Sequence, residues 1–401
     1  MPIGYLVTTT LVAVCTVFAL APPRPRRSSA SNKSYWLGFL VNELPFLAFL
    51  WLLSATLFAV GQGDIGSPVG LVGLGVAVLA TIGLAIVVRR ALATSQAITR
   101  ALNEAGIVAR LRRRLPLGRI LFAPFVFRRG DVRRVPNISY GDAGKWNLLD
   151  VYHHRARPSG GPMLVYFHGG AFRSGKKNRE ARPLIYRLAS QGWVCVSANY
   201  RLSPPARFPD HLVDVKKVIA WVREHGHEYG ADPEVLFVAG SSAGGHLAST
   251  AALTPNDPAF QPGFERAETS VTAAISLYGY YGSVGVDRPP SSPLAYVRAD
   301  APPFFVAHGD LDTVVLVEDA RRFVEQLRSA SASPVVYAEL PGALHTFDLF
   351  HSLRFDTVVD GIEAFAAWVR SRRQPVSASS NAVLASAPNT PKTTRSSDEG
   401  S

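Results

Sequence analysis

The pentapeptide Gly240-Ser241-Ser242-Ala243-Gly244 constrains this chain more than any other segment. It follows the apolar run 235–239 and leads into a helix-forming stretch at residues 246–249. A serine that joins a buried strand to a helix takes a strained backbone conformation, and small neighbours let adjacent segments approach it. Such a turn raises the hydroxyl clear of the sheet, above a helix N-terminus that offers backbone N–H groups. Of the two serines, only Ser242 has glycines two positions away on both sides, so we expect Ser242 to be an exposed nucleophile.

Apolar and amphipathic segments alternate from about residue 131 to residue 372. Several apolar segments are continuous runs, as expected for strands whose two faces are both covered. The alternation predicts an α/β fold with a mostly parallel sheet flanked by helices. Strands are predicted at 147–152, 163–168, 193–200, 235–239, 271–277, 304–308 and 335–340, and helices at 182–190, 211–225, 318–329 and 355–370. We assign residues 131–373 to one domain and expect the Ser-, Ala- and Pro-rich tail 374–401 to be disordered.

Three apolar runs open the chain, at residues 3–21, 35–60 and 67–88. Each reaches the roughly 20 residues that a helix needs to cross a ~30 Å hydrocarbon core, so residues 1–90 are predicted to hold three transmembrane helices. The first run lacks the basic flank and cleavage site of a signal peptide. Glu43 interrupts the second run, and a carboxyl at membrane depth can mark a functional site. We prefer the alternative that Glu43 lies near the membrane interface or packs between spans.

The net charge of +12 comes largely from one block, where residues 89–134 carry twelve arginines against two acidic residues. Because this block adjoins the apolar spans, anionic lipid headgroups are a better partner for it than nucleic acid. The first loop is basic and the second, 61–66, is not. Positive loops stay on the cytoplasmic side, so we expect the amino terminus outside and the α/β domain in the cytoplasm.

Residues 91–130 form a basic linker or cap between the spans and the α/β domain. Within this segment, 91–115 mixes aliphatic residues with arginines at helical intervals, which predicts an amphipathic helix at the membrane interface. The next stretch, 117–127, is rich in Phe, Leu and Ile. It either lies among the headgroups, covers the entrance to a site, or packs against the α/β domain.

The chain has two cysteines, Cys15 and Cys195, one in an apolar run and one in a predicted strand. This spacing indicates neither a disulfide framework nor a metal site. We therefore expect no metal and no cofactor.

A serine hydroxyl needs a general base to attack an ester, and the base needs a carboxylate to orient it. His345 and His351 follow the pentapeptide by a whole strand–helix–strand unit. His345 comes directly after the last predicted strand, on a Gly- and Pro-marked loop, where an α/β sheet presents ligands. His351 lies in a helical-looking stretch, so His345 is the predicted base for Ser242.

The orienting acid is sought in the loop after the predicted strand 304–308. Asp310 and Asp312 both lie there. We favour Asp312, because the chain has turned by that point and two valines follow to bury it, whereas Asp310 suits a turn or a helix cap. Asp348 is a more distant alternative.

His168-Gly169-Gly170-Ala171-Phe172 ends the predicted strand 163–168. Small residues in succession leave backbone N–H groups uncovered, and these can surround a developing oxyanion together with the N–H that follows the nucleophile. The predicted oxyanion hole therefore combines the amides of this loop with the N–H of Ala243. His168 is interpreted as a structural residue that positions its loop.

Residues 131–372 resemble α/β-hydrolase carboxylesterases of the hormone-sensitive-lipase-like group, and with the spans in front the chain is similar to membrane-anchored Lip-type esterases of actinobacteria and mycobacteria. The resemblance lies in His168-Gly169-Gly170-Ala171-Phe172, Asn199-Tyr200-Arg201-Leu202-Ser203-Pro204, Phe208-Pro209, Gly230-Ala231-Asp232-Pro233, Ser241-Ser242-Ala243-Gly244-Gly245-His246, His308-Gly309-Asp310-Leu311-Asp312 and Gly342-Ala343-Leu344-His345.

The resemblance implies an α/β-hydrolase fold with a catalytic triad of Ser242, Asp312 and His345. It also implies an oxyanion hole formed by Gly169, Gly170 and Ala243. It implies a serine carboxylesterase or lipase that cleaves short-to-medium acyl esters through an acyl-enzyme. Ser241 departs from the family, which usually has aspartate there, and Ala171 replaces a frequent glycine. Alternatives are an amide or formamide hydrolase with the same triad, a non-catalytic ligand-binding module, and a lipid-surface scaffold. The pair Tyr280-Tyr281 is expected either to line the substrate pocket or to fill the core.

Overall fold

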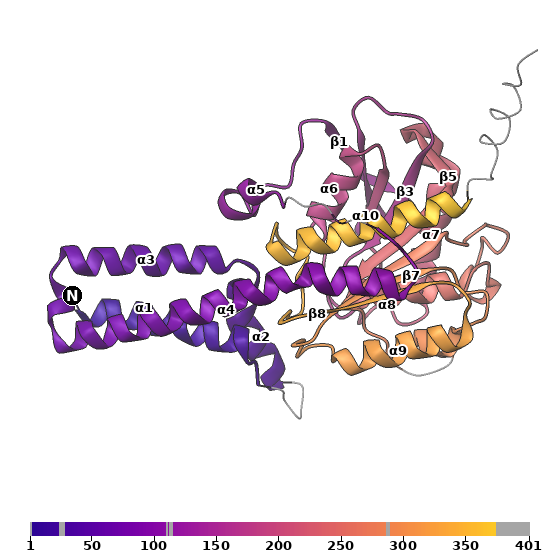
Figure 1. The fold of residues 1–401 in the computed structure, drawn as a ribbon. Helices are drawn as coiled ribbons and strands as arrows, with labels where there is room; N and C mark the ends of the chain where they lie inside the picture. The colour runs from indigo at the N-terminus through magenta and orange to yellow at the C-terminus, as the bar shows by residue number, and fades with distance from the viewer. Residues whose placement is uncertain (1, 24–28, 110, 112–114, 286–288, 374–401) are drawn as a thin grey trace, which may run out of the picture.

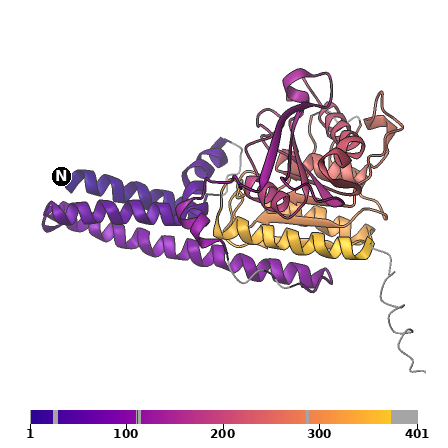
Figure 2. The same cartoon turned by 90° about the horizontal axis from the view of Figure 1, so that it is seen from above.

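A computed structural model of the chain describes residues 2–23, 29–109, 111, 115–285 and 289–373, with residues 29–34 described as backbone only. The predicted disordered tail 374–401 lies outside these residues, as does part of the arginine block. A bundle of long helices extends from one end of an α/β domain (Figures 1 and 2). The helices of this amino-terminal region are α1 (Pro2–Leu20), α2 (Ser29–Glu43), α3 (Pro45–Gly61) and α4 (Pro68–Glu104).

Two of these helices, α1 and α4, are long and apolar enough to cross a membrane. The predicted span 35–60 is wrong as a single helix, because α2 and α3 meet at an angle of 91° and make a third span only if the bent pair is counted as one. The break falls at Leu44, whose ψ of 53° is not helical. Pro45 causes it, since proline disfavours helix in the residue before it and lacks the N–H that the helix would use.

Helix α4 continues without a break from the apolar run into the predicted interfacial helix 91–115. It ends at Glu104, with Ala105 as its C-cap, and the next residue, Gly106, takes a positive φ of 72° as a helix-terminating glycine does. Its last turns pack on the α/β domain: Ile98 is fully buried there, against Gly361 and in one cluster with Phe305. The apolar face of the described residues of this segment covers the α/β domain, so the prediction that this face lies in a membrane interface is wrong.

The stretch 117–127 divides between the alternatives left open for it. Its short helix α5 (Leu117–Phe122) places Ile120 in a buried cluster with Ala91 and Leu353. Phe122 and Phe125 are exposed. Part of the segment therefore packs against the protein, and part presents apolar side chains outward.

The α/β domain has one eight-stranded sheet in the order β1-β2-β4-β3-β5-β6-β7-β8. The two pairings of β2, with β1 and with β4, are antiparallel, and the strands from β4 to β8 run parallel. The strands are β1 (Val132–Ser139), β2 (Leu148–His154), β3 (Gly161–Phe167), β4 (Val194–Ala198), β5 (Ala231–Ser241), β6 (Ala273–Leu277), β7 (Phe304–Gly309) and β8 (Val335–Leu340). All seven predicted strands are present, and the mostly parallel α/β fold is confirmed. Strand β1 was not predicted, because it is largely exposed, carries two arginines and contains Pro136.

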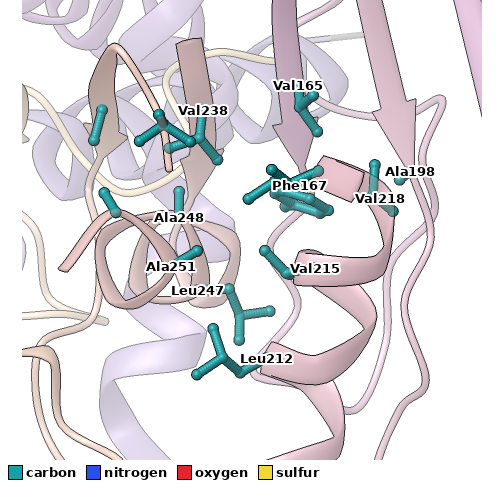
Figure 3. Packing of buried hydrophobic residues seen from close by; sticks show 14 of the residues in the cluster. Val165, Phe167, Ala198, Leu212, Val215, Val218, Val238, Leu247, Ala248 and Ala251 are labelled. Atoms are coloured by element: carbon teal, nitrogen blue, oxygen red, sulfur yellow. The ribbon is translucent and has the colours of Figure 1, made fainter. Parts of the chain in front are cut away.

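Helices cover both faces of this sheet. On one face, α7 (Asp210–His225), α8 (Ala243–Leu253) and α9 (Val317–Ala330) pack on apolar side chains such as Val165, Phe167 and Val238 (Figure 3). On the other face, α6 (Arg182–Ser190), α10 (Leu353–Arg373) and the end of α4 pack on Leu164, Phe237 and their neighbours. Short 3₁₀ helices occur at Asp64–Gly66, Gly144–Asn147, Gly226–Tyr229, Pro258–Phe260 and Pro293–Tyr296. The continuous apolar runs of the sequence are thus the central strands of a sheet buried on both sides.

Candidate active site

Ser242 joins β5 to α8 in the strained conformation that the pentapeptide predicts. Its φ of 52° and ψ of −117° lie far from the usual regions for a residue with a side chain. The glycines on either side are needed for close approach: a Cβ on Gly240 would lie 2.2 Å from the carbonyl oxygen of Gly244, and a Cβ on Gly244 would lie 2.0 Å from that of Phe167. Only glycine fits these positions, so the turn and the direction of the Ser242 hydroxyl are fixed by the sequence.

The structure brings the three predicted triad side chains together. Nε2 of His345 lies 3.0 Å from Oγ of Ser242, and Nδ1 of His345 lies 2.6 Å from Oδ2 of Asp312. The histidine comes from the loop after β8 and the aspartate from the loop after β7, which are neighbouring parallel strands. A base within hydrogen-bond reach of a nucleophile, itself oriented by a carboxylate, is the geometry required to activate a hydroxyl.

Asp312 is fully enclosed by donors. Its Oδ1 accepts the backbone N–H groups of Val314 and Val315 at 2.8 and 2.9 Å. Nε2 of the buried His308 lies 3.4 Å from Oδ2. Burial alone raises the pKa of Asp312, but the charge of His345 and the hydrogen bonds from both histidines outweigh it and hold that pKa well below its usual range. His308 was given no role from the sequence, although it lies near the end of β7 within the motif His308-Gly309-Asp310-Leu311-Asp312.

The alternatives to the predicted acid and base lie elsewhere. His351 directs Nδ1 to the Asp356 carboxylate at 3.1 Å and stacks on Phe127. Asp310 accepts the N–H of Gly342 at 2.7 Å, in keeping with a turn-stabilising role. Asp348 lies behind the nucleophile turn, as described below.

One predicted oxyanion donor is engaged elsewhere. The N–H of Gly169 donates to the buried carboxyl of Glu180 at 2.5 Å, so this amide is not free for a substrate. Gly170 and Ala171 follow with φ of 119° and 52°, both in the left-handed region. Within the described part of the chain, no hydrogen bond uses the N–H of Gly170, Ala171 or Ala243. The free amides of the site are therefore those of Gly170, Ala171 and Ala243, and the placement of Gly169 among them is corrected.

A buried polar network supports the turn from behind. Ser241 donates from Oγ to Oδ2 of Asp348 at 2.6 Å, and Tyr278 donates to Oδ1 of the same carboxylate at 2.5 Å. The Tyr166 hydroxyl lies 2.7 Å from Oγ of Ser241. Asp348 thus supplies the carboxylate at a place where Ser241 stands for the usual aspartate. No local sequence pattern predicts that Asp348 is the partner of Ser241, because Asp348 lies 107 residues further along the chain.

Burial, together with the nearby Asp348 carboxyl, raises the pKa of Glu180. Two buried carboxyl groups close together do not both ionise readily, because like charges repel strongly in a region of low dielectric. Asp348 accepts several hydroxyl hydrogen bonds, which favour its ionised form. Burial raises the pKa of Asp348 as well, and at that carboxyl the hydrogen bonds from Ser241, Tyr278 and Tyr166 act in the opposite direction.

The remaining predicted residues have structural positions. His168 is buried, stacks on Tyr200 with ring centroids 4.5 Å apart, and has a pKa lowered to about 4 by burial. Tyr281 fills the core, where it stacks on Phe323. Tyr280 is half-buried and stacks on His246. A cavity of about 550 Å³ borders the oxyanion loop and is lined by Ala171, Phe172, Arg173, Ser203, Pro204, Arg207, Phe208, His211, Val284 and Gly285.

The helices of the amino-terminal region also reach the site. Tyr35 of α2 packs edge-on against His345, with ring centroids 6.2 Å apart at 80°. The side-chain amide of Asn42, also on α2, donates to the carbonyl of Gly342 at 2.8 Å. A Cβ on Gly342 would lie 2.6 Å from Cδ of Arg90 on α4. The loop that carries the histidine is thus enclosed by α2 and α4, an arrangement that sequence reasoning did not predict.

Glu43 anchors this arrangement to the α/β domain. Its carboxylate is paired with Arg354 at the start of α10 and accepts the Ser352 hydroxyl at 2.8 Å. Arg354 also donates to Oδ1 of Asn42 at 2.9 Å. Its charge is balanced by a residue of the α/β domain, a partner that the interpretation from the sequence did not include. In the sequence, the only indication of the contact with Arg354 was that Glu43 interrupts an apolar run.

The described residues contain no group of three or more His, Cys, Asp or Glu side chains that could hold a metal ion. Cys15 and Cys195 are free thiols. The side chains at the site suffice for acyl transfer through a serine nucleophile.

Comparisons with known proteins agree with this chemistry. The chain is 38% identical over 405 residues to the probable carboxylic ester hydrolase LipM of Mycobacterium tuberculosis, covering 92% of this chain and 93% of LipM. It is 42% identical over 264 residues to esterase LipQ of the same organism, covering 59% of this chain and 63% of LipQ. The BD-FAE family matches residues 149–289.

Among solved structures, Thermogutta terrifontis esterase 2 phosphorylated by paraoxon has a TM-score of 0.53 and 25% identity, covering 60% of this chain and 95% of that chain. The similarity to LipM extends over the amino-terminal helices as well as the α/β domain. The chain therefore belongs to the Lip-type carboxylic ester hydrolases of the hormone-sensitive-lipase-like α/β-hydrolase group, and it is a serine ester hydrolase.

Proposed function

We propose that this protein is a membrane-anchored carboxylesterase that cleaves short-to-medium acyl esters with Ser242, His345 and Asp312 as its catalytic triad. The observation that carries the proposal is the unbroken chain of contacts from Ser242 Oγ to His345 Nε2 and from His345 Nδ1 to Asp312, at 3.0 and 2.6 Å.

In the proposed mechanism, Ser242 Oγ attacks the acyl carbon while His345 Nε2 takes its proton. The N–H groups of Gly170, Ala171 and Ala243 stabilise the oxyanion of the tetrahedral intermediate. Collapse of the intermediate breaks the bond to the alcohol, which leaves with the proton from His345. Water then attacks the acyl-enzyme, gives a proton to His345, and releases the carboxylic acid as Ser242 regains its hydrogen.

Helices α1 and α4 support anchoring in a membrane, because each is long and apolar enough to span one. We place the protein in the plasma membrane with its α/β domain in the cytoplasm, on the strength of the basic first loop and the arginine block. Anionic headgroups are the proposed partners of these arginines. A reporter fused after Val88 tests the orientation, and external activity of the reporter contradicts it.

Replacing Ser242 by alanine tests the assignment of the nucleophile. We expect S242A to lose both turnover of a p-nitrophenyl acyl ester and labelling by a fluorophosphonate. Ser329→Ala, an exposed serine of α9, is the matched control and should keep both. Retained turnover in purified S242A contradicts the proposal.

The same triad can also attack amides, so amide hydrolysis is the alternative activity. The names of LipM and LipQ favour esters. A panel of esters and anilides with the same acyl groups separates the two activities. Faster cleavage of the anilides would reverse the order of the two candidates.

A further inference from the structure

Helix α2 crosses the end of the membrane bundle instead of continuing it. It bends by 91° from α3 and lies between the bundle and the α/β domain (Figures 1 and 2). A helix at right angles to spanning helices runs along the membrane plane. Helix α2 therefore lies at the junction between the bundle and the α/β domain, where the apolar parts of the spanning helices end.

The outer face of α2 is apolar. Trp36, Leu37 and Leu40 are 58%, 40% and 47% exposed, and their spacing places them together on one side of the helix. The inner face is fixed by tight packing, since a Cβ on Gly38 would lie 2.8 Å from the backbone of Phe18. Rotation of α2 about its axis would break this packing, so the apolar side chains remain turned outward.

A second exposed apolar strip adjoins the first. Leu117, Phe122, Phe125 and Val126 lie on and after α5 with exposed side chains. Phe350 connects the two strips, with ring centroids 6.4 Å from Phe39 and 5.2 Å from Phe125. The apolar surface is therefore continuous from α2 across Phe350 to the segment 117–126.

This surface borders the reacting groups. Tyr35, on the inner face of α2, contacts His345, which in turn lies 3.0 Å from Ser242. The same helix thus has one face on the catalytic histidine and the opposite face outward at the level where the spans end. In a soluble enzyme, such an exposed apolar face would favour association with other molecules.

We propose that α2 and the segment 117–126 lie in the headgroup layer of the adjoining leaflet, and that the substrate is an ester dissolved in that leaflet which reaches Ser242 past α2. The occupant of the apolar surface is lipid, because the surface is continuous with helices that are apolar enough to span a membrane. This inference rests on the proposed esterase function and names its substrate class.

The test compares one enzyme on two substrates: monomeric p-nitrophenyl acetate in water, and dioctanoylglycerol carried in phosphatidylcholine vesicles that also hold the full-length protein. The variant is Leu37→Gln with Leu40→Gln, which leaves Tyr35 and Asn42 in place. Because each leucine loses its apolar contact with lipid, we expect the rate on the vesicle-borne ester to fall about tenfold and the rate on p-nitrophenyl acetate to stay within about twofold.

Val108→Gln is the matched control. Val108 is 95% exposed and follows the end of α4. The last turns of α4 lie alongside the α/β domain, away from the bundle (Figure 1). It should change neither rate. Equal loss on both substrates, or no loss beyond that of the control, overturns the inference. Failure of the esterase assignment has a different signature, since S242A would then turn over both substrates.

A second measurement does not depend on activity. Four tryptophans remain besides Trp36 and Trp51, so the Trp36 emission is taken as the difference between the Trp51→Phe variant and the double variant Trp36→Phe with Trp51→Phe. This difference should be quenched by phosphatidylcholine brominated near the headgroup more than by lipid brominated deep in the chains. Quenching by aqueous iodide alone overturns the inference. Protection from both quenchers indicates that protein, such as a second copy of the chain, covers α2, and also overturns it.

Discussion

Ser242 and His345 lie 3.0 Å apart, but they are held by different parts of the molecule. The serine turn is fixed within the α/β domain, by its two glycines and by the network of Ser241, Asp348 and Tyr166. The histidine loop is held on one side by Asp312 and on the other by α2 and α4. The position of the nucleophile should therefore not depend on the amino-terminal helices, whereas that of the base should.

The largest expected effect comes from the support of His345 inside the α/β domain. Asp312→Asn keeps the shape of the side chain, but its amide no longer stabilises the imidazolium or the correct tautomer. We expect kcat to fall by about 10³–10⁴, as measured by steady-state turnover of a p-nitrophenyl ester. Asp310→Asn is the control, because an amide oxygen can still accept the N–H of Gly342, and it should retain most activity. Similar losses in both variants would contradict the assignment of Asp312.

The next effect concerns the ion pair that joins the amino-terminal helices to the α/β domain. Glu43 and Arg354 are both almost fully buried, and removing one partner leaves an uncompensated charge. We expect Arg354→Met to lower the free energy of unfolding in detergent micelles by about 3–5 kcal/mol. The double variant with Glu43→Gln should recover much of this loss, because it removes the second charge as well. If the two losses simply add, the residues are not coupled as the structure indicates.

The same division explains how far the sequence could be interpreted. The serine turn, Asp312 and His345 stand in short local patterns, at strand ends whose order is visible in the chain. The missed features are contacts between distant residues: Ser241 with Asp348, Tyr35 with His345, and the pairing of Glu43 with a residue 311 positions away.

The amino-terminal helices show the limit of composition as a guide. The run 35–60 has the composition of a span, but Pro45 divides it into two helices. The segment 91–115 has an amphipathic pattern, and the buried apolar side chains of its described residues pack on the α/β domain instead of lipid. Periodicity predicts that a helix has an apolar face, but it does not identify what covers that face.

A smaller effect is expected where α2 touches the base. Tyr35→Ala removes the ring that packs on His345, and an aromatic pair contributes on the order of 1 kcal/mol, so we expect kcat to fall by up to about tenfold. Tyr35→Phe keeps the ring and should stay within about twofold of the parent. Fluorophosphonate labelling rates provide the measurement, since they report the activation of Ser242 directly. A full rate in the alanine variant would show that α2 does not position His345.

The smallest effect concerns the serine side of the comparison, through the carboxyl that holds Gly169. Glu180 has a pKa raised by burial and by Asp348, while Arg179 acts in the opposite direction. A carboxyl with a raised pKa in the folded protein contributes stability at low pH, and this contribution is lost as the pH rises from its unfolded pKa through its folded one. The melting temperature of the parent should therefore decline over that interval. Glu180→Gln, whose amide oxygen still accepts the Gly169 N–H, should show a flatter profile and a kcat within about threefold of the parent at low pH. An unchanged slope would mean that Glu180 is ionised throughout, with its charge balanced by Arg179.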